Sequence, residues 1–326
     1  MMRIKFFLLL NIHLFFVVSV WGDLLEIQAW EKAYPQNPED LRAIQAQLQS
    51  LLPDAEKAVV SIETGDGAGS GVIISPEGLV LTAAHVIGST GKRMKVRLHD
   101  GKRLSAITLG GSELSDAGML KIKGRKNLPY APVSEKDLSS IGDWCFALGH
   151  PGGFDSERGV IVRLGRIIGK KNETMQTDSR LLGGDSGGPL FDFEGQVIAI
   201  HSRVSSQPDQ NFHIPIESFH ANWEFFRDES MLTLDSLGDG GFLGISCEES
   251  TEGLLVNEVL AGTPAEEAGI LAGDLLLKLD GDLLSTRENL TISVSQKKPG
   301  DIVRITYERE GNLLSSEIKL ARRSEE

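Results

Sequence analysis

Cysteine is scarce in this sequence, which has two such residues, Cys145 and Cys247, among 326. Each lies in an apolar, strand-like run, and we expect the two runs to belong to different domains, where a buried thiol packs as a small hydrophobic side chain. This placement argues against a disulfide between them. No HExxH or CxxC motif occurs, and the spacing of the remaining histidines fits no familiar metal site. We therefore predict no metal and no organic cofactor.

Basic residues are also in the minority. The 33 Lys and Arg residues are outnumbered by 46 Asp and Glu residues, which gives a net charge of -13. Binding to phosphate backbones requires clustered Lys and Arg, and the chain does not concentrate them anywhere. The composition therefore argues against a nucleic-acid partner.

The first 22 residues have the pattern of an export signal. Arg3 and Lys5 precede an apolar stretch from Phe6 to Val20, and Gly22 is small enough for a cleavage site. The pattern predicts a signal peptide and a periplasmic or otherwise extracytoplasmic or secreted protein. The alternative is an uncleaved anchor that spans a bilayer with Trp21 at the interface, which would leave the protein membrane-anchored.

Glycines surround one serine in the segment 183–189, which reads GGDSGGP. Glycine permits backbone angles that other residues avoid, so the amides of Gly184 and Ser186 can point to one spot beside the Ser186 hydroxyl. Two convergent amides of this kind form an oxyanion hole. The segment alone is equally compatible with a glycine-rich turn between two strands.

Two upstream residues supply the partners that a nucleophilic serine needs. Activation of a serine hydroxyl requires a base, usually a histidine that a buried carboxylate holds in one tautomer. His85 follows an apolar run of two short predicted strands, and Asp116 stands immediately before another strand-like run. The chain order His, Asp, Ser is that of the two-barrel serine proteases. We therefore predict a catalytic triad of His85, Asp116 and Ser186.

With these strings in place, the chain resembles the HtrA (DegP/Do-like) serine proteases. The resemblance rests on TAAHV at 82–86, Asp116 followed by LKI at 120–122, ALGHPG at 147–152, QTD at 176–178 and the GDSGG loop. Two departures stand out: Asp185 precedes the serine where the family usually has Asn, and Ala117-Gly118 replaces bulkier apolar residues. The second departure predicts looser packing behind Asp116.

The length and the strand pattern predict several domains. A chain of 326 residues suits two or three domains, and repeated short strands with glycine-rich turns fit packed antiparallel barrels. The resemblance implies a mainly β fold, in which a chymotrypsin-like double six-stranded β-barrel is followed by a PDZ domain of α+β type. The expected divisions are a signal peptide (1–22), an N-terminal helical segment (23–55), a trypsin-like serine protease domain (56–227), a linker (228–240) and a PDZ domain (241–323).

Two predicted helices flank the protease domain. The string NPED at 37–40 is a good helix start, and Leu41, Ile44, Leu48 and Leu51 then share one face. That face either packs on the barrel or, together with Trp30 and Tyr34, helps to form the trimer that is usual in the family. After the barrel strands we expect a helix over 217–227 whose aromatic residues pack on the barrel.

The residue preference before the scissile bond depends on a pocket that the resemblance places at residues Leu181, Leu182, His201 and Arg203. HtrA pockets usually accept small aliphatic side chains, which Leu181 suits. His201, however, stands where the distantly related glutamyl endopeptidases carry a histidine that recognises glutamate, and an imidazolium can pair with a carboxylate. The alternative is a ring that is hydrogen-bonded within its strand. The choice between small aliphatic and acidic residues stays open here.

The C-terminal segment is similar to a PDZ domain in its strings GFLGI at 241–245, PAEEAGI at 264–270 and GDLL at 273–276. In such domains backbone amides receive a peptide C-terminal carboxylate while a strand pairs with the extended ligand. The predicted groove residues are Gly241, Phe242, Leu243, Gly244, Ile245, Leu290 and Val294. The alternative is a domain that only packs and spaces subunits.

These features together predict a serine endopeptidase, and the resemblance implies that it degrades unfolded or damaged proteins as a homotrimer or higher oligomer. Its partners would be unfolded protein or peptide substrates and, at the PDZ domain, peptide C-termini. One alternative is a PDZ-led scaffold or chaperone whose protease site is latent. An esterase is disfavoured because the serine lies in GDSGGP and not in the GxSxG elbow of α/β-hydrolases. The physiological substrate, the activating signal and the oligomer size stay open.

Overall fold

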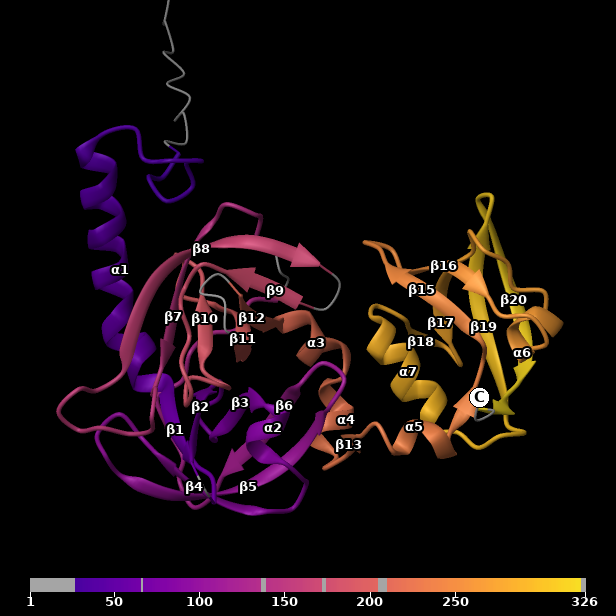
Figure 1. The fold of residues 1–326 in the computed structure, drawn as a ribbon, viewed down its shortest axis with the longest axis horizontal. Coiled ribbons are helices and arrows are strands. Elements are labelled where there is room, and N and C mark those ends of the chain that lie inside the picture. Colours follow the sequence, from indigo (N-terminus) through magenta and orange to yellow (C-terminus); the bar gives the residue numbers. More distant parts are fainter. Residues whose placement is uncertain (1–26, 66, 136–138, 172–173, 205–209, 324–326) are drawn as a thin grey trace, which may run out of the picture.

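The computed structural model describes residues 27–323, apart from 66, 136–138, 172–173 and 205–209. The predicted signal peptide lies outside the described residues. Figure 1 shows two β-rich lobes, the first in indigo to pink and the second in orange to yellow. A short connection joins them and includes α4 (Trp223–Arg227), β13 (Met231–Leu232) and α5 (Ser236–Asp239).

The first lobe begins with a closed antiparallel barrel. Its strands are β1 (Val59–Glu63), β2 (Ala68–Ile73), β3 (Leu79–Ala83), β4 (Arg93–Arg97), β5 (Arg103–Ser112) and β6 (Ala117–Ile122). They pair in the order β5-β4-β1-β2-β3-β6, and a further pairing of β5 with β6 closes the ring. The Asp-Gly pair at 100–101 predicts a hairpin between the strand-like runs on either side of it, and these residues form the β4–β5 turn. The order matters for the site because β3, which precedes His85, pairs directly with β6, which follows Asp116.

A second closed barrel carries the predicted nucleophile. Its strands are β7 (Trp144–Gly149), β8 (Ile161–Lys171), β9 (Thr174–Thr177), β10 (Pro189–Phe191), β11 (Val197–Val204) and β12 (Asn211–Pro215). They pair in the ring order β10-β11-β12-β9-β8-β7. One hydrophobic core extends through both barrels, from Ile62 and Leu81 in the first to Phe146 and Phe191 in the second. Within the described residues, the predicted pair of six-stranded barrels is confirmed.

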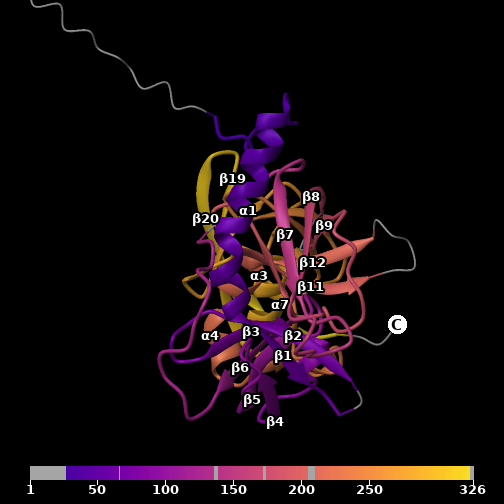
Figure 2. The ribbon, with the colours of Figure 1, turned by 90° about the vertical axis from the view of Figure 1, so that its left-hand side faces the viewer.

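The long N-terminal helix α1 (Pro38–Ala58) begins as the sequence predicts, because the Asn37 side chain accepts a hydrogen bond from the Asp40 amide and Pro38 occupies the first turn. Figure 2 shows α1 lying along the outside of the barrels, on the side nearest the viewer. Ile44 is 2% exposed, and the Gln47 side chain donates to the Phe193 carbonyl at 2.8 Å. The helix therefore packs on the second barrel.

Not all of the predicted apolar face is used in this packing. Leu41 is 55% exposed and Tyr34 is 68% exposed. Trp30, in contrast, packs against Phe193 with ring centroids 6.1 Å apart. Barrel packing thus accounts for Trp30 and Ile44 but leaves Tyr34 and Leu41 open to solvent in a single chain.

The segment after the barrels differs from the prediction in two places. The expected helix over 217–227 is two short helices, α3 (Ile216–Ala221) and α4 (Trp223–Arg227), because Asn222 has φ -119° and ψ 20° and interrupts the helical path. The expected linker 228–240 contains β13 (Met231–Leu232) and α5 (Ser236–Asp239). Since β13 pairs in parallel with the end of β5, this part of the connection is fastened to the first barrel.

The second lobe has a core of its own, centred on Leu254, Leu276, Val303 and Ile305. Its main sheet runs in the order β15-β16-β17-β19-β20 (Ile245–Glu249, Leu254–Val259, Leu275–Leu279, Ile302–Arg309 and Asn312–Lys319), and β18 (Asp282–Leu283) pairs with β17. The strands β14 (Gly241–Phe242) and β21 (Ala321–Arg322) pair separately. The helices are α6 (Pro264–Glu267) and α7 (Arg287–Ser295), and α7 begins after Thr286, whose side chain accepts a hydrogen bond from the Asn289 amide.

Candidate active site

His85 is presented by the short helix α2 (Ala84–Ile87), which begins directly after strand β3. Because Ala83 of β3 pairs with Ala117 of β6, the residue before β6, Asp116, lies beside α2. The Ala84 amide donates to the Asp116 carbonyl at 2.6 Å, and the His85 amide donates to Asp116 Oδ1 at 3.0 Å. The two predicted triad residues are therefore joined through the backbone as well as through their side chains.

The His85 ring is hydrogen-bonded to the Asp116 carboxylate. Nδ1 lies 2.9 Å from Oδ1 and 3.0 Å from Oδ2. This contact fixes Nδ1 as the ring donor and leaves Nε2 able to accept a proton. The His85 side chain is 52% exposed, so the other ring edge is open to a substrate.

The electrostatics of this pair suit a general base. The hydrogen bond to Asp116 raises the pKa of His85 above its ordinary value of 6.5. Burial alone would raise the pKa of Asp116, but hydrogen bonds from His85 and Ser202 outweigh it and hold the pKa below 3.8. Asp116 is therefore ionised at neutral pH and stabilises the imidazolium that forms when His85 accepts a proton.

Asp116 has an unusual backbone conformation, with φ +62°. A non-glycine residue in the left-handed region is uncommon and is kept there by its surroundings. The expected looser packing behind it is wrong: Ala117 is fully buried, and a Cβ on Gly118 would lie 2.9 Å from the Ala83 carbonyl oxygen. Glycine at 118 allows this close approach of β6 to the start of α2.

Ser186 occupies a tight turn just before β10. The Ser70 amide donates to the Ser186 carbonyl at 2.8 Å, which ties the turn to β2 of the first barrel. Gly187 has φ +86°, and a Cβ there would lie 2.1 Å from Thr82 Oγ1 and 2.2 Å from the Ser70 carbonyl oxygen. Glycine is therefore required at 187 for the two barrels to meet at the serine.

Ser202 of β11 links the serine to the acid. Its hydroxyl donates to Asp116 Oδ2 at 2.6 Å, and its carbonyl accepts a hydrogen bond from Ser186 Oγ at 3.1 Å. Within the described residues, Ser186 Oγ makes this bond and none to His85. Catalytic hydrogen bonds are often long or misaligned without substrate and form in the reacting complex, so direct proton transfer from Ser186 to His85 stays a prediction.

The predicted oxyanion-hole amides are available. In the part of the chain that the structure describes, the backbone amides of Gly184 and Ser186 donate to no protein acceptor. Gly184 has φ +99°, and its carbonyl accepts from Ser70 Oγ at 2.8 Å. Donors that are held in place without a partner are suited to an oxygen on which negative charge develops.

The four predicted pocket residues have different surroundings. Leu181 is 4% exposed and Leu182 is 47% exposed, while Arg203 lies over the Phe212 ring at 5.6 Å. His201 is fully buried, and its Nδ1 lies 3.0 Å from Nδ1 of His213. Burial sets the pKa of His201 well below 6.5, so its ring is neutral. Neutrality weakens the argument for charge pairing with glutamate and favours the alternative of a ring hydrogen-bonded inside the barrel.

In the second lobe, one hollow of about 120 Å³ lies between α7 and the segment that leads into β15. All seven predicted groove residues line it, and Leu237, Thr291, Ser295 and Arg323 complete the lining. The sequence analysis missed Arg323, whose guanidinium lies 5.5 Å from the centre of the Phe242 ring. Only the pairing of β14 with β21 brings this residue from the end of the chain to the groove.

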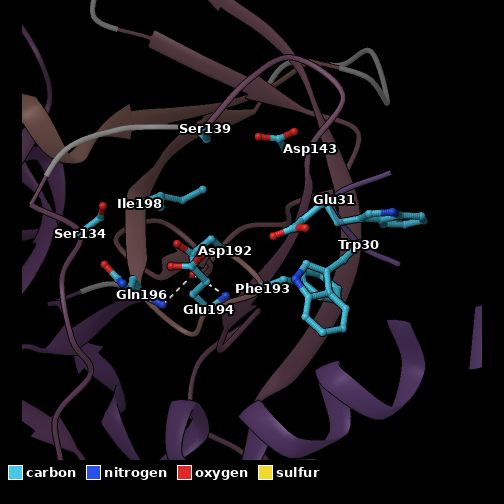
Figure 3. Close-up of a pocket in the computed structure, with 11 residues that line it drawn as sticks. Trp30, Glu31, Ser134, Ser139, Asp143, Asp192, Phe193, Glu194, Gln196 and Ile198 are labelled. Carbon is cyan, nitrogen blue, oxygen red and sulfur yellow. Dashed lines mark hydrogen bonds between the residues drawn. The ribbon is translucent and has the colours of Figure 1, made fainter. Parts of the chain in front are cut away.

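A larger cavity of about 270 Å³ lies away from the triad, between the N-terminal segment and the β10–β11 turn. Figure 3 shows the carboxylates of Glu31, Asp192 and Glu194 on its wall, near the Trp30 indole. Its lining includes none of the predicted catalytic residues, so we do not assign it to the reaction. No cluster of metal-ligating side chains occurs among the described residues.

The fold and these contacts define a class, a two-barrel serine protease of chymotrypsin type joined to a PDZ domain. The family model for a trypsin-like peptidase domain matches residues 69–200, and the PDZ domain model matches 241–320. A Synechocystis protein named as a serine protease, HhoA, is 31% identical over 290 residues, which cover 78% of this chain and 71% of the relative. The chain belongs to the HtrA family of serine proteases, with one PDZ domain.

Other relatives and solved structures agree with this assignment. A DegP-like periplasmic serine endoprotease of Chlamydia pneumoniae is 31% identical over 277 residues, or 79% of this chain and 56% of the relative. The chain thus spans little more than half the length of that relative. A serine endoprotease from Yersinia pestis shares 27% identity with a TM-score of 0.56, and the HtrA-type protease AlgW with a tripeptide shares 26% with a TM-score of 0.59. Each alignment covers 85% of this chain and 98% of the neighbour.

None of the helices in the described residues is both long and apolar enough to cross a membrane.

Proposed function

We propose that this chain is an extracytoplasmic serine endopeptidase that degrades unfolded or damaged proteins. The observation that carries the proposal is the Asp116 carboxylate, which binds His85 Nδ1 and Ser202 Oγ while Ser186 Oγ rests on the Ser202 carbonyl. The backbone amides of Gly184 and Ser186, which donate to no acceptor among the described residues, accompany this arrangement. The names of relatives as periplasmic endoproteases support both the reaction and the location.

In the proposed reaction, His85 removes the Ser186 proton as the hydroxyl oxygen attacks the substrate carbonyl carbon. Asp116 stabilises the imidazolium, and the amides of Gly184 and Ser186 bind the oxyanion of the tetrahedral intermediate. The imidazolium then protonates the leaving amine, which yields an acyl-enzyme. Water hydrolyses the acyl-enzyme by the same route, with His85 again as the base.

The PDZ domain is proposed to bind peptide C-termini. The amides of the Gly241–Gly244 loop would receive the terminal carboxylate, and the ligand strand would pair along β15. Arg323 at the edge of the same hollow adds a cation that suits a carboxylate. We further propose a homotrimer or higher oligomer, in which contacts between subunits would cover the exposed Tyr34 and Leu41.

The test of the endopeptidase activity is turnover of unfolded casein, followed on a gel for the wild type and for Ser186→Ala. Cleavage by the wild type alone is expected. A fluorophosphonate probe should label the wild type and spare the Ser186→Ala variant. Cleavage by both proteins would point to a contaminant and would contradict the proposal.

The second candidate function is a PDZ-led scaffold or chaperone with a latent protease site. It is favoured by one observation, the Ser186 hydroxyl donating to the Ser202 carbonyl and not to His85. Under this alternative the protein would bind C-terminal peptides without turnover and would resist the serine probe. Probe labelling that begins only when a C-terminal peptide is added would combine the two functions.

Residue preference is tested separately, with peptides that carry Val, Ala or Glu before the scissile bond. Because His201 is buried and neutral, we expect cleavage after Val and Ala. Efficient cleavage after Glu that is lost in His201→Ala would establish the acidic preference instead.

A further inference from the structure

One buried carboxylate stands between the two amides of the candidate oxyanion hole. Asp185 separates Gly184 from Ser186, and its side chain is 0% exposed. Its Oδ2 accepts a hydrogen bond from the Leu182 amide at 2.8 Å. Its Oδ1 is buried and has no hydrogen-bond partner among the described residues. The contacts that stabilise the Asp185 carboxylate are therefore made through Oδ2.

Arg163 forms an ion pair with Asp185, and Arg158 adds a second positive charge farther away. Arg163 Nη2 lies 2.9 Å from Asp185 Oδ2, and the Arg163 side chain is 15% exposed. The arginine comes from β8 and is paired with Ala147 of β7, so it reaches the loop from the barrel wall. Of the ion pairs formed by described residues, this is the one that involves Asp185.

Burial and pairing act on Asp185 in opposite directions. Burial raises the pKa of the Asp185 carboxyl, while the Leu182 amide and the Arg163 guanidinium oppose that rise. Removing one partner of a buried ion pair leaves an uncompensated charge, which is far more costly than losing a surface pair. Without Arg163, the carboxylate would have to take up a proton or turn toward water.

A turn of the side chain toward water would change the loop, because Asp185 closes the turn that contains Gly184. The Asp185 amide donates to the Leu182 carbonyl at 3.0 Å while its side chain accepts from the Leu182 amide. Gly184 is held so closely that a Cβ would lie 2.5 Å from the Gly152 amide nitrogen. A movement of Asp185 would therefore displace the amides of Gly184 and Ser186 together.

We propose that Arg163 is a positioning residue for the oxyanion hole, which acts through its buried ion pair with Asp185 to keep the turn 182–185 folded. The inference rests on the proposed endopeptidase activity and adds to it a residue far from the triad in sequence. An Asn at 185 would carry no charge and would need no cation, whereas the Asp185 carboxylate needs one. Asp and Arg are thus expected to act as a matched pair in this chain.

The test is a mutant cycle on Arg163 and Asp185. Arg163→Met removes the cation and keeps an apolar stem of similar length, and Arg163→Met/Asp185→Asn removes both charges while Asn can still accept from the Leu182 amide. Arg166→Met is the matched control, because Arg166 is on the same strand but stacks on the Trp144 ring at 3.9 Å. The conservative Arg163→Lys keeps a cation.

The readout is kcat and KM for dye-labelled casein, together with the rate of labelling by a fluorophosphonate and the thermal unfolding temperature. Loss of one oxyanion donor lowers kcat by about 100-fold or more, so we expect Arg163→Met to show such a fall with KM within about threefold of wild type. The double variant should recover to within about tenfold, Arg163→Lys should retain most activity, and Arg166→Met should match the wild type in kcat.

Several outcomes would overturn the inference. The inference fails if Arg163→Met and Arg166→Met have equal kcat, or if Arg163→Met changes KM alone. It also fails if Arg163→Met/Asp185→Asn loses as much kcat as Arg163→Met. If Arg163→Met does not fold, the double variant decides the question. An Arg163→Met/Asp185→Asn protein that is folded but inactive would then overturn the inference. An inactive, unlabelled wild type would instead remove the proposed function itself, and this inference with it.

Discussion

The side chain of Glu288, in the helix that walls the PDZ groove, accepts a hydrogen bond from the backbone amide of Ser115 at 3.2 Å. Ser115 immediately precedes Asp116, the acid of the proposed triad. Glu288 is 2% exposed and also accepts from the Asn222 side chain at 2.9 Å. One buried carboxylate therefore joins helix α7, which carries the groove residues Leu290 and Val294, to the protease loop that holds the acid.

Removal of this carboxylate should uncouple the two domains. Glu288→Ala leaves the Ser115 amide and the Asn222 side chain without this partner, and hydrogen bonds to charged groups contribute about 1.5–3 kcal/mol. We expect the urea-unfolding free energy to fall by a similar amount. Glu258→Ala, at an exposed position of the same domain, should change it by less than about 0.5 kcal/mol. Equal effects of the two variants would mean that the contact is not formed in solution.

The pH dependence of activity should follow His85. Its pKa is raised above 6.5 by Asp116, and the neutral ring is the base. Activity should therefore be low below that raised pKa and increase as the pH rises through it. The contribution of the His85–Asp116 ion pair to the stability of the fold has the opposite pH dependence. It is fully present below pH 6.5 and is lost as the pH rises through the folded-state pKa of His85.

Asp116→Asn provides the matching variant for this profile. It should lower kcat by about 10⁴-fold, since the tautomer is no longer set, and should move the His85 pKa down. An NMR titration of the His85 ring in Ser186→Ala and in Ser186→Ala/Asp116→Asn measures the shift without turnover. An identical His85 pKa in both proteins would contradict the ion pair.

The hydroxyl of Ser202 should support the acid. Ser202→Ala removes the donor to Asp116 Oδ2 but keeps the carbonyl on which Ser186 rests. Loss of one charge-assisted hydrogen bond of about 1.5–3 kcal/mol corresponds to a fall in kcat of about 10- to 150-fold, and KM should stay near the wild-type value. Ser105→Ala, on strand β5 of the first barrel and outside the proposed site, serves as the control. A wild-type kcat in Ser202→Ala would show that His85 alone holds Asp116.

Glycine at 187 should be indispensable. In Gly187→Ala the new methyl group would clash with Thr82 and Ser70 at a residue whose φ is +86°. Backbone strain of about 1–2 kcal/mol adds to the clash, so we expect a lower unfolding temperature and loss of probe labelling. Gly238→Ala, where nothing lies within 4 Å of the added Cβ, should leave both unchanged. Normal labelling of Gly187→Ala would mean that the loop can reach its reactive form another way.

Much of the predicted secondary structure rested on patterns of neighbouring residues in the sequence. The hairpin at Asp100-Gly101 and helix α7 follow from turn residues and helix starts, whose physics involves neighbours in the chain. The expected single helix over 217–227 was wrong because Asn222, whose side chain binds Glu288 from the PDZ domain, has a non-helical backbone there. The linker prediction did not include β13, because the partner of this strand, β5, lies more than a hundred residues earlier in the chain.

The sequence by itself determined which residues carry the proposed chemistry, because a nucleophile, a base and glycine-rich turns are recognisable one short segment at a time. Only the tertiary structure decided which residues surround them. Ser202 donates a hydrogen bond to Asp116, Arg163 forms an ion pair with the buried Asp185, and Glu288 accepts a hydrogen bond from the Ser115 amide. The reason is physical. A buried charge or amide needs a partner, but nothing in the local sequence says which distant strand or helix will supply it, and barrel closure and domain packing make that choice.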